Sequence, residues 1–375
     1  MKKLFLHCFI VLFVFNYISC NVNDTNSPSD DIDFKIGQML MVGFKGYEVN
    51  SRSSVTDDIN KFNIGGVVLY DYDVPTQRFE RNIQSVQQVG KLTNALKSNS
   101  SLPLLIAIDQ EGGRVNRLKT NYGFPASVSA QYLGSLNNID STRKYAALTA
   151  STLAAAGINI NLAPVVDLNT NPDNPVIGRI GRSFSSDPSV VAVHSAEIIN
   201  VHHQYNVLTT LKHFPGHGSS RTDSHLGFTD VTDTWQEIEL EPYRTLINSG
   251  KCDLIMTAHI FNSKLDADFP ATLSKNIITG ILRNQLNFNG VVISDDMQMK
   301  AISDHYGLET AIYRAIDAGV DILLFANNSI YDEQISGKAI SIIKKLILEG
   351  KISRERIEQS FLRISKLKFK IYSGS

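Results

Sequence analysis

The chain has 375 residues, of which 43% are hydrophobic, so it can bury the core of one large domain or of two ordinary ones. Its 36 basic and 37 acidic residues give a net charge of -1 at pH 7, with no long block of one sign. This balance offers no electrostatic footprint for a nucleic acid, so we expect no nucleic-acid partner. Cys252 is the one cysteine in the body of the chain, so no intramolecular disulfide is expected there.

The N-terminal residues have the composition of an export signal. Lys2 and Lys3 precede an almost uninterrupted apolar run over residues 4–15. This run is shorter than the roughly 20 residues that a spanning helix needs, which weakens the alternative of a transmembrane anchor. We therefore predict a signal peptide over residues 1–19.

A cysteine directly follows this segment. Ser19, a small residue, precedes Cys20, and a polar stretch follows. The arrangement resembles the lipobox of bacterial lipoproteins, although Tyr17 stands where leucine is usual. We expect a lipid on Cys20, a polar linker over residues 20–31, and an exported protein anchored to a membrane, on the periplasmic side or at the outer membrane of a Gram-negative-type bacterium.

Apolar runs of strand length alternate with longer helical patterns through the rest of the chain. Eight candidate strands lie at residues 38–44, 65–70, 102–109, 160–165, 207–214, 253–259, 290–295 and 321–325. Between or after them, apolar residues spaced three and four apart predict helices at 143–156, 190–204, 234–248, 275–285 and 309–318, and two closing helices after residue 328.

Eight strand-then-helix repeats predict an α/β fold with a parallel sheet, either a closed (β/α)8 TIM barrel or an open doubly wound sheet. Polar and glycine-rich loops follow the ends of many different strands, as the active site of a barrel requires, so we favour the barrel. No linker to a second domain stands out, and we expect one catalytic domain over residues 32–375.

The loop after the third strand, DQEGGRVNRL, brings Asp109, Glu111, Arg114 and Arg117 around two glycines. Such a cluster can bind a polyhydroxyl compound, because each sugar hydroxyl both donates and accepts. A structural ion-pair network is the alternative, and Glu111 fits that alternative better. The long loop after the fourth strand adds Arg179 and Arg182, and either could hold a substrate oxygen.

The stretch KHFPGHGSSRTDSH follows the fifth strand and holds Lys212, His213, His217, Asp223 and His225. An aspartate two residues before a histidine can accept its ring N–H and raise its pKa, which makes the pair an acid/base candidate. The three histidines could nominally ligate zinc, but their spacing matches no compact metal motif, so we expect no metal.

The seventh strand ends in VISDDMQM. Adjacent carboxylates rarely point the same way, so Asp295 can face the barrel mouth as a nucleophile while Asp296 caps the next helix. A double helix cap is the alternative. Among the other histidines, we expect His202 and His203 at the surface of a helix and His259 near the pocket.

Several of these motifs resemble, in the same order, the bacterial β-N-acetylhexosaminidases of glycoside hydrolase family 3, in the NagZ-like branch. They are DQEGGRVNR, NPVIGRIGRSF, KHFPGHG with DSH, MTAHIF with PATLS, and VISDDMQM. The resemblance implies a single TIM barrel that removes terminal, non-reducing β-linked N-acetylglucosamine with retention and without a cofactor.

By position, the resemblance implies that Asp295 is the nucleophile and that His225, paired with Asp223, is the general acid/base. The residues it implies for the sugar are Asp109, Arg117, Arg182, Lys212 and His213, with Met299 at the pocket wall. Arg179 belongs to an RIGR sequence that is longer than the usual GxRSF, so the choice between the two arginines stays open.

The natural substrate stays open among peptidoglycan fragments, chitin oligomers and host glycans. A β-glucosidase or a glycoside phosphorylase on the same scaffold is the first alternative. A non-catalytic, lipid-anchored sugar-binding protein is the second, and a metal-dependent hydrolase is the third. We expect a monomer.

Overall fold

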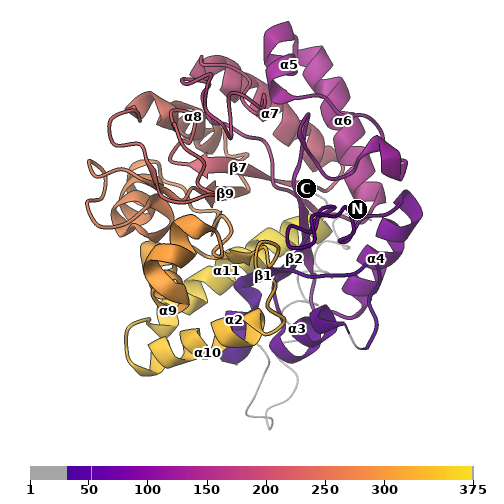
Figure 1. Ribbon diagram of the computed structural model, residues 1–375, viewed down its shortest axis with the longest axis vertical. Coiled ribbons are helices and arrows are strands. Elements are labelled where there is room, and N and C mark those ends of the chain that lie inside the picture. Colours follow the sequence, from indigo (N-terminus) through magenta and orange to yellow (C-terminus); the bar gives the residue numbers. More distant parts are fainter. Residues whose placement is uncertain (1–31, 52, 374–375) are drawn as a thin grey trace, which may run out of the picture.

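The computed structural model describes residues 32–51 and 53–373, so the predicted signal, Cys20 and the polar linker lie outside the described residues. A parallel sheet of eight strands forms the centre (Figure 1), in the order β11-β9-β7-β6-β3-β2-β1-β12. The strands are β1 Leu40–Gly43, β2 Gly66–Leu69, β3 Leu105–Ile108, β6 Ile160–Asn161, β7 Leu208–Phe214, β9 Leu254–Thr257, β11 Val291–Ile293 and β12 Leu323–Phe325.

The two ends of this sheet meet. Ile293, the last residue of β11, bridges Ile322 in parallel register, and the N–H of Ser294 donates to the Ile322 carbonyl at 3.0 Å. An open doubly wound sheet has free edges, so this closure excludes it and confirms the predicted (β/α)8 barrel. Every residue of these eight strands is buried, which is why most of the strands read as apolar runs.

Helices form the outer ring. They are α2 Ile32–Gln38, α3 Ser54–Phe62, α4 Val86–Ser98, α5 Ala130–Leu136, α6 Ile139–Ala155, α7 Pro188–Gln204, α8 Glu241–Asn248, α9 Lys300–Ala318, α10 Ile335–Leu348 and α11 Arg354–Ser373, with a wider π-type helix at Asn276–Gln285. At the start of α7, the local sequence determines where the helix begins. Asp187 accepts the N–H of Ser189 at 2.8 Å, and Pro188 occupies the first turn, where its missing N–H costs nothing.

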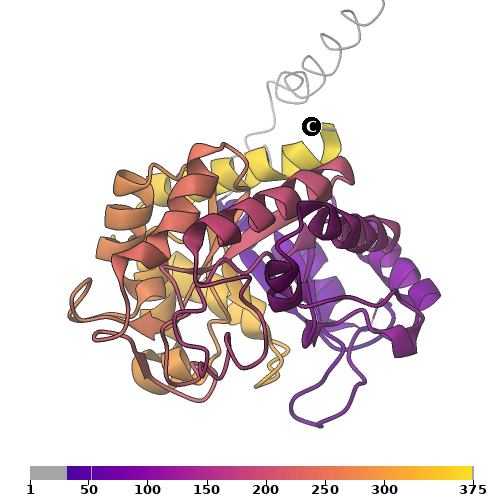
Figure 2. The same ribbon diagram turned by 90° about the horizontal axis from the view of Figure 1, so that it is seen from above.

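Helix α11 crosses the end of the barrel at which the strands begin. Its Lys368 Nζ donates to Gln38 just before β1 at 2.6 Å, and its Arg363 donates to Asp321 just before β12 at 3.1 Å. In Figure 2, α11 lies at the top of the view and the long loops lie at the bottom. The carboxyl ends of the strands are therefore left open for a site.

Some sequence-based expectations about the helices were wrong. The segment 234–248 divides into a 3-10 turn, Glu237–Leu240, and the short helix α8. Helix α9 begins nine residues before the predicted 309, and Gly307, with φ of 66°, interrupts it. His202 is buried rather than at the surface, because its ring bonds Asn161 of β6 at 3.1 Å.

Among the residues that the structure describes, no helix is both long and apolar enough to cross a membrane.

Candidate active site

An open cleft lies at the carboxyl ends of the barrel strands. It brings together all the side chains that the sequence predicted for catalysis and sugar binding, although they come from the ends of four different strands and the loops that follow them. These are Asp109, Arg117, Arg182, Lys212, His213, Asp223, His225, Asp295 and Met299. Tyr70, Tyr72, Val176 and Asn328 add further wall residues that the sequence analysis did not single out.

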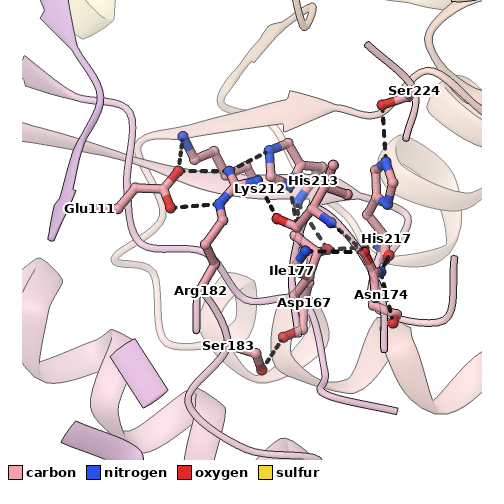
Figure 3. Close-up of polar contacts among 12 residues, drawn as sticks. Glu111, Asp167, Asn174, Ile177, Arg182, Ser183, Lys212, His213, His217 and Ser224 are labelled. Carbon is pink, nitrogen blue, oxygen red and sulfur yellow. Dashed lines mark hydrogen bonds and ion pairs between the residues drawn. The ribbon is translucent and has the colours of Figure 1, made fainter. Parts of the chain in front are cut away.

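Opposite charges alternate in the deep part of the cleft. We call Asp109, Glu111, Arg117, Arg182 and Lys212 the charged floor. Lys212 Nζ lies 2.8 Å from Asp109 Oδ1 and 2.6 Å from Glu111 Oε1. Arg182 donates two hydrogen bonds, of 2.7 and 2.8 Å, to the carboxylate of Glu111 (Figure 3). Arg117 Nη2 lies 3.3 Å from Asp109.

The charged floor stays ionised because its charges compensate one another. Burial alone would raise the pKa of Asp109, but Lys212 and Arg117 hold it well below its ordinary value. Burial likewise opposes ionisation of Glu111, and Arg182 and Lys212 lower the pKa of that carboxyl. Glu111 is therefore a structural partner, as the sequence favoured. Arg179 is exposed and does not line the cleft, so Arg182 is the arginine that the fold places there.

Asp167 is a buried residue that the sequence analysis did not single out. It follows the fourth strand and accepts the N–H of His213 at 3.1 Å, the Nδ1–H of His213 at 2.7 Å and the N–H of His217 at 2.8 Å. With Nδ1 donating to Asp167, His213 Nε2 can accept from Arg182 Nη2 at 3.2 Å. The only signal in the sequence was its place directly after the run LAPVV.

The predicted acid/base pair lies at the mouth of the cleft. Asp223 Oδ1 accepts both the backbone N–H of His225 at 2.8 Å and the ring Nδ1–H at 2.7 Å. The ring Nε2 is therefore the nitrogen that can reach a ligand. Partial desolvation by the surrounding cleft lowers the pKa of His225, but the bond to Asp223 and the charge of Asp295 outweigh it and raise that pKa above its ordinary value.

Asp295 is the predicted nucleophile and lies just beyond β11. Burial raises its pKa, but the surrounding imidazole groups of His259, His213 and His225 hold the net pKa below the ordinary value. The N–H of Asp296 also donates to Asp295 Oδ1 at 2.8 Å. This carboxylate is consequently ionised at neutral pH and has a lone pair to offer.

Asp296 plays a different part from the one expected. Helix α9 begins only at Lys300, and Asp296 Oδ1 instead accepts the N–H groups of Gln298 at 3.1 Å and Ala326 at 2.9 Å. It therefore ties the β11 loop to the β12 loop rather than capping a helix. Burial, together with the neighbouring charge of Asp295, raises the pKa of Asp296 to about 6.

Among the described residues, no group of three His, Cys, Asp or Glu side chains has the arrangement of a metal site. The ring of His213 is bonded to Asp167, that of His217 to Ser224, and that of His225 to Asp223. These three rings, which could nominally ligate zinc, are thus each oriented by a different partner.

Comparison with known proteins places these observations in one family. The family described as "Glycosyl hydrolase family 3 N terminal domain" matches residues 31–367. The chain is 34% identical to Beta-hexosaminidase A of Pseudoalteromonas piscicida, across 91% of this chain and 61% of that protein. It is 36% identical to a Beta-hexosaminidase of Tolumonas auensis, across 77% of this chain and 83% of that protein.

Solved structures agree with the sequence relatives. A glycoside hydrolase family 3 beta-N-acetylglucosaminidase from Paenibacillus sp. superposes with a TM-score of 0.83 at 34% identity, covering 92% of this chain and 63% of that one. A Beta-N-acetylhexosaminidase from Beutenbergia cavernae superposes with a TM-score of 0.80 at 26% identity, covering 90% and 98%. The chain thus spans less than two thirds of some relatives and nearly all of others.

Proposed function

Because the chain belongs to glycosyl hydrolase family 3, we propose that it is a retaining exo-β-N-acetylglucosaminidase. Its substrate is a terminal, non-reducing, β-linked N-acetylglucosamine residue on a peptidoglycan fragment, a chitin-type oligomer or a host glycan. The observation that carries this proposal is the convergence of an ionised carboxylate, Asp295, and a proton donor, His225, on one cleft with a charged floor. The names of the relatives support the choice of sugar.

In the first step, a carboxylate oxygen of Asp295 attacks the anomeric carbon while His225 Nε2 gives its proton to the glycosidic oxygen. The bond between that carbon and oxygen breaks, the aglycone leaves as an alcohol, and the sugar is held as an ester on Asp295. In the second step, neutral His225 takes a proton from water, whose oxygen attacks the same carbon and releases the carboxylate. Asp223 assists both steps by holding the ring and stabilising its cationic form.

The charged floor would bind the hydroxyl groups of the sugar. Asp109 offers carboxylate acceptors, and Arg117, Arg182 and Lys212 offer N–H donors, so each hydroxyl can both donate and accept. Because these groups already hold one another in place, little ordering is left to be done when the sugar arrives. His213 and Met299 complete the pocket wall.

A panel of aryl β-glycosides tests this function. The protein should cleave the N-acetylglucosaminide well above the glucoside, and NMR of early time points should record the β-anomer as the first product. Preference for the glucoside, or first release of the α-anomer, contradicts the proposal. Added phosphate that diverts the product to a sugar phosphate would identify a phosphorylase, and sugar binding without any cleavage would identify a non-catalytic binding protein.

We also propose, from the sequence alone, that the protein is exported and held at a membrane by a lipid on Cys20. Replacing Cys20 by Ser should move the protein from the detergent phase to the aqueous phase, and mass spectrometry of the mature N-terminus should detect the lipid. An unmodified N-terminus would contradict the anchor. A monomer is proposed as well, and light scattering on the purified protein tests it.

A further inference from the structure

The loop that carries the acid/base pair has two halves that are held very differently. In the first half, Asn174 Nδ2 donates to the carbonyl of His217 at 2.7 Å and to that of Gly218 at 3.0 Å, and Asn171 Nδ2 donates to the Ser220 carbonyl at 2.8 Å. The N–H of His217 is also bonded to Asp167. This half is therefore fixed to the barrel.

The second half, residues 221–228, is largely exposed. His225 itself is 59% exposed at the side chain, and the next residue, Leu226, is 75% exposed. Ser224 is the single buried residue in this half, with 2% exposure, and it stands directly between the two members of the acid/base pair. Its hydroxyl oxygen lies 3.1 Å from Nε2 of the buried His217. One buried contact thus joins the fixed half of the loop to the exposed half.

We propose that His217 is a positioning residue, which holds the acid/base pair over the cleft by its contact with Ser224. The proposal rests on the function proposed above, since it concerns the same loop. His217 is buried and does not line the cleft. It acts through Ser224, whose backbone continues into Asp223 on one side and His225 on the other.

The contact between His217 and Ser224 also links the position of the loop to that of the sugar-binding groups. Figure 3 shows an unbroken series of bonds from Glu111 through Arg182, His213, Asp167 and His217 to Ser224. Asp167 accepts from both His213 and His217, so it sets the distance between the deep pocket and the start of the loop. Burial lowers the pKa of His217 to about 4, so the ring is neutral at the working pH and forms a neutral bond with the hydroxyl.

Ser224→Ala tests the proposal, because it deletes the hydroxyl with almost no change in volume. Ser220→Ala is the matched control: the same atom is removed from the same loop, but the buried Ser220 hydroxyl has no hydrogen-bonding partner among the described residues. Ser224→Thr keeps the hydroxyl and should restore most of the wild-type behaviour.

The catalytic readout compares two leaving groups. A disaccharide needs the acid, whereas a dinitrophenyl N-acetylglucosaminide needs little protonation. We expect Ser224→Ala to lower kcat/KM for the disaccharide roughly three- to tenfold, with a change under about twofold on the dinitrophenyl substrate. The inhibition constant of free N-acetylglucosamine should not move. An equal loss on both substrates, or the same loss in Ser220→Ala, overturns the proposal.

A second readout does not depend on catalysis. Arg221 is exposed at the junction of the two halves, so trypsin can report how often the second half opens. Under native conditions, cleavage after Arg221 should be several-fold faster in Ser224→Ala than in wild type, Ser220→Ala or Ser224→Thr. Equal rates in all four proteins overturn the proposal even if the enzyme proves to act on another sugar, whereas failure of the proposed function alone leaves the expected difference in cleavage intact.

Discussion

The charged floor and the exposed half of the acid/base loop lie in one cleft but are built on opposite principles. In the charged floor, the Lys212 side chain is 2% exposed and Glu111 6%, and each carboxylate meets two cations. In the loop, one carboxylate meets one imidazole whose side chain is 59% exposed. Recognition of a sugar benefits from groups that are already ordered, whereas a proton donor has to meet different leaving groups and then water.

Removing Asp295, the proposed nucleophile, should give the largest effect. Asp295→Ala deletes the carboxylate that we propose bonds to the sugar, so kcat on an aryl N-acetylglucosaminide should fall by a factor on the order of 10⁴ to 10⁶. Sugar binding to the charged floor should survive, and calorimetry with N-acetylglucosamine measures it. Added azide should partly restore turnover and give the α-glycosyl azide, because it attacks the face that the carboxylate has left. Activity within tenfold of wild type would contradict the assignment of Asp295.

A floor substitution should destabilise the protein far more than a loop substitution. Glu111→Gln leaves Arg182 without its carboxylate and Lys212 with one partner instead of two, in a buried site. We expect a loss of about 3–5 kcal/mol in the free energy of unfolding, measured with urea at pH 7. Asp223→Asn is the control and should change that free energy by less than about 0.5 kcal/mol, because its partner His225 is 59% exposed at the side chain. Similar losses in both variants would remove the distinction between the two regions.

The same Asp223→Asn variant should change the rate of catalysis and its pH dependence. The carboxylate raises the pKa of His225, so its removal lowers that pKa and the cationic form is lost at a lower pH. The alkaline limb of the profile of kcat/KM should therefore move to lower pH, and the rate on a disaccharide should fall roughly 100-fold. An unchanged alkaline limb would mean that another group supplies the proton.

The sequence predicted the barrel because its strands are buried on both faces and most of them therefore read as apolar runs. It also predicted the charged residues that end those strands, since loops at the carboxyl ends of a barrel converge whatever their details. It could not predict Asp167, whose role depends on two histidines 46 and 50 positions away. His202 was assigned to the wrong environment for a similar reason, because its partner Asn161 lies 41 positions away on β6.

The spacing of apolar residues could not predict the π-type helix or the break in α9 at Gly307, because that spacing is interpreted on the assumption of one regular α-helix. Asp296 illustrates the remaining limit. An acidic residue just before a helical pattern predicts an N-cap, yet the structure uses its carboxylate to join two neighbouring loops, a choice made by the packing of β11 against β12.

Glu239 is a buried carboxyl group that contacts the start of the acid/base loop. Unlike the carboxylates of the charged floor, it has no cation beside it among the described residues. It is 1% exposed, and its Oε2 accepts the N–H of Gly218 at 3.1 Å. The chain passes so close that a Cβ on Gly216, with φ of +121°, would lie 2.6 Å from the Cβ of Glu239. Burial, helped by the charge of Asp167, raises the pKa of Glu239 from 4.5 to about 7.

This shift has a definite sign. Between pH 4.5 and 7 the folded protein keeps a proton that the unfolded chain has lost, so the stability falls as the pH rises, and the full penalty applies above 7. Glu239→Gln removes the charge and keeps an acceptor for Gly218. The variant should match wild type near pH 5 and be more stable by up to about 2–3 kcal/mol near pH 8.5, in urea unfolding at the two values. A buried carboxyl group without a cation thus stays protonated up to about neutrality, whereas the compensated carboxylates of the charged floor stay ionised well below it. A variant no more stable than wild type at alkaline pH would overturn this contrast.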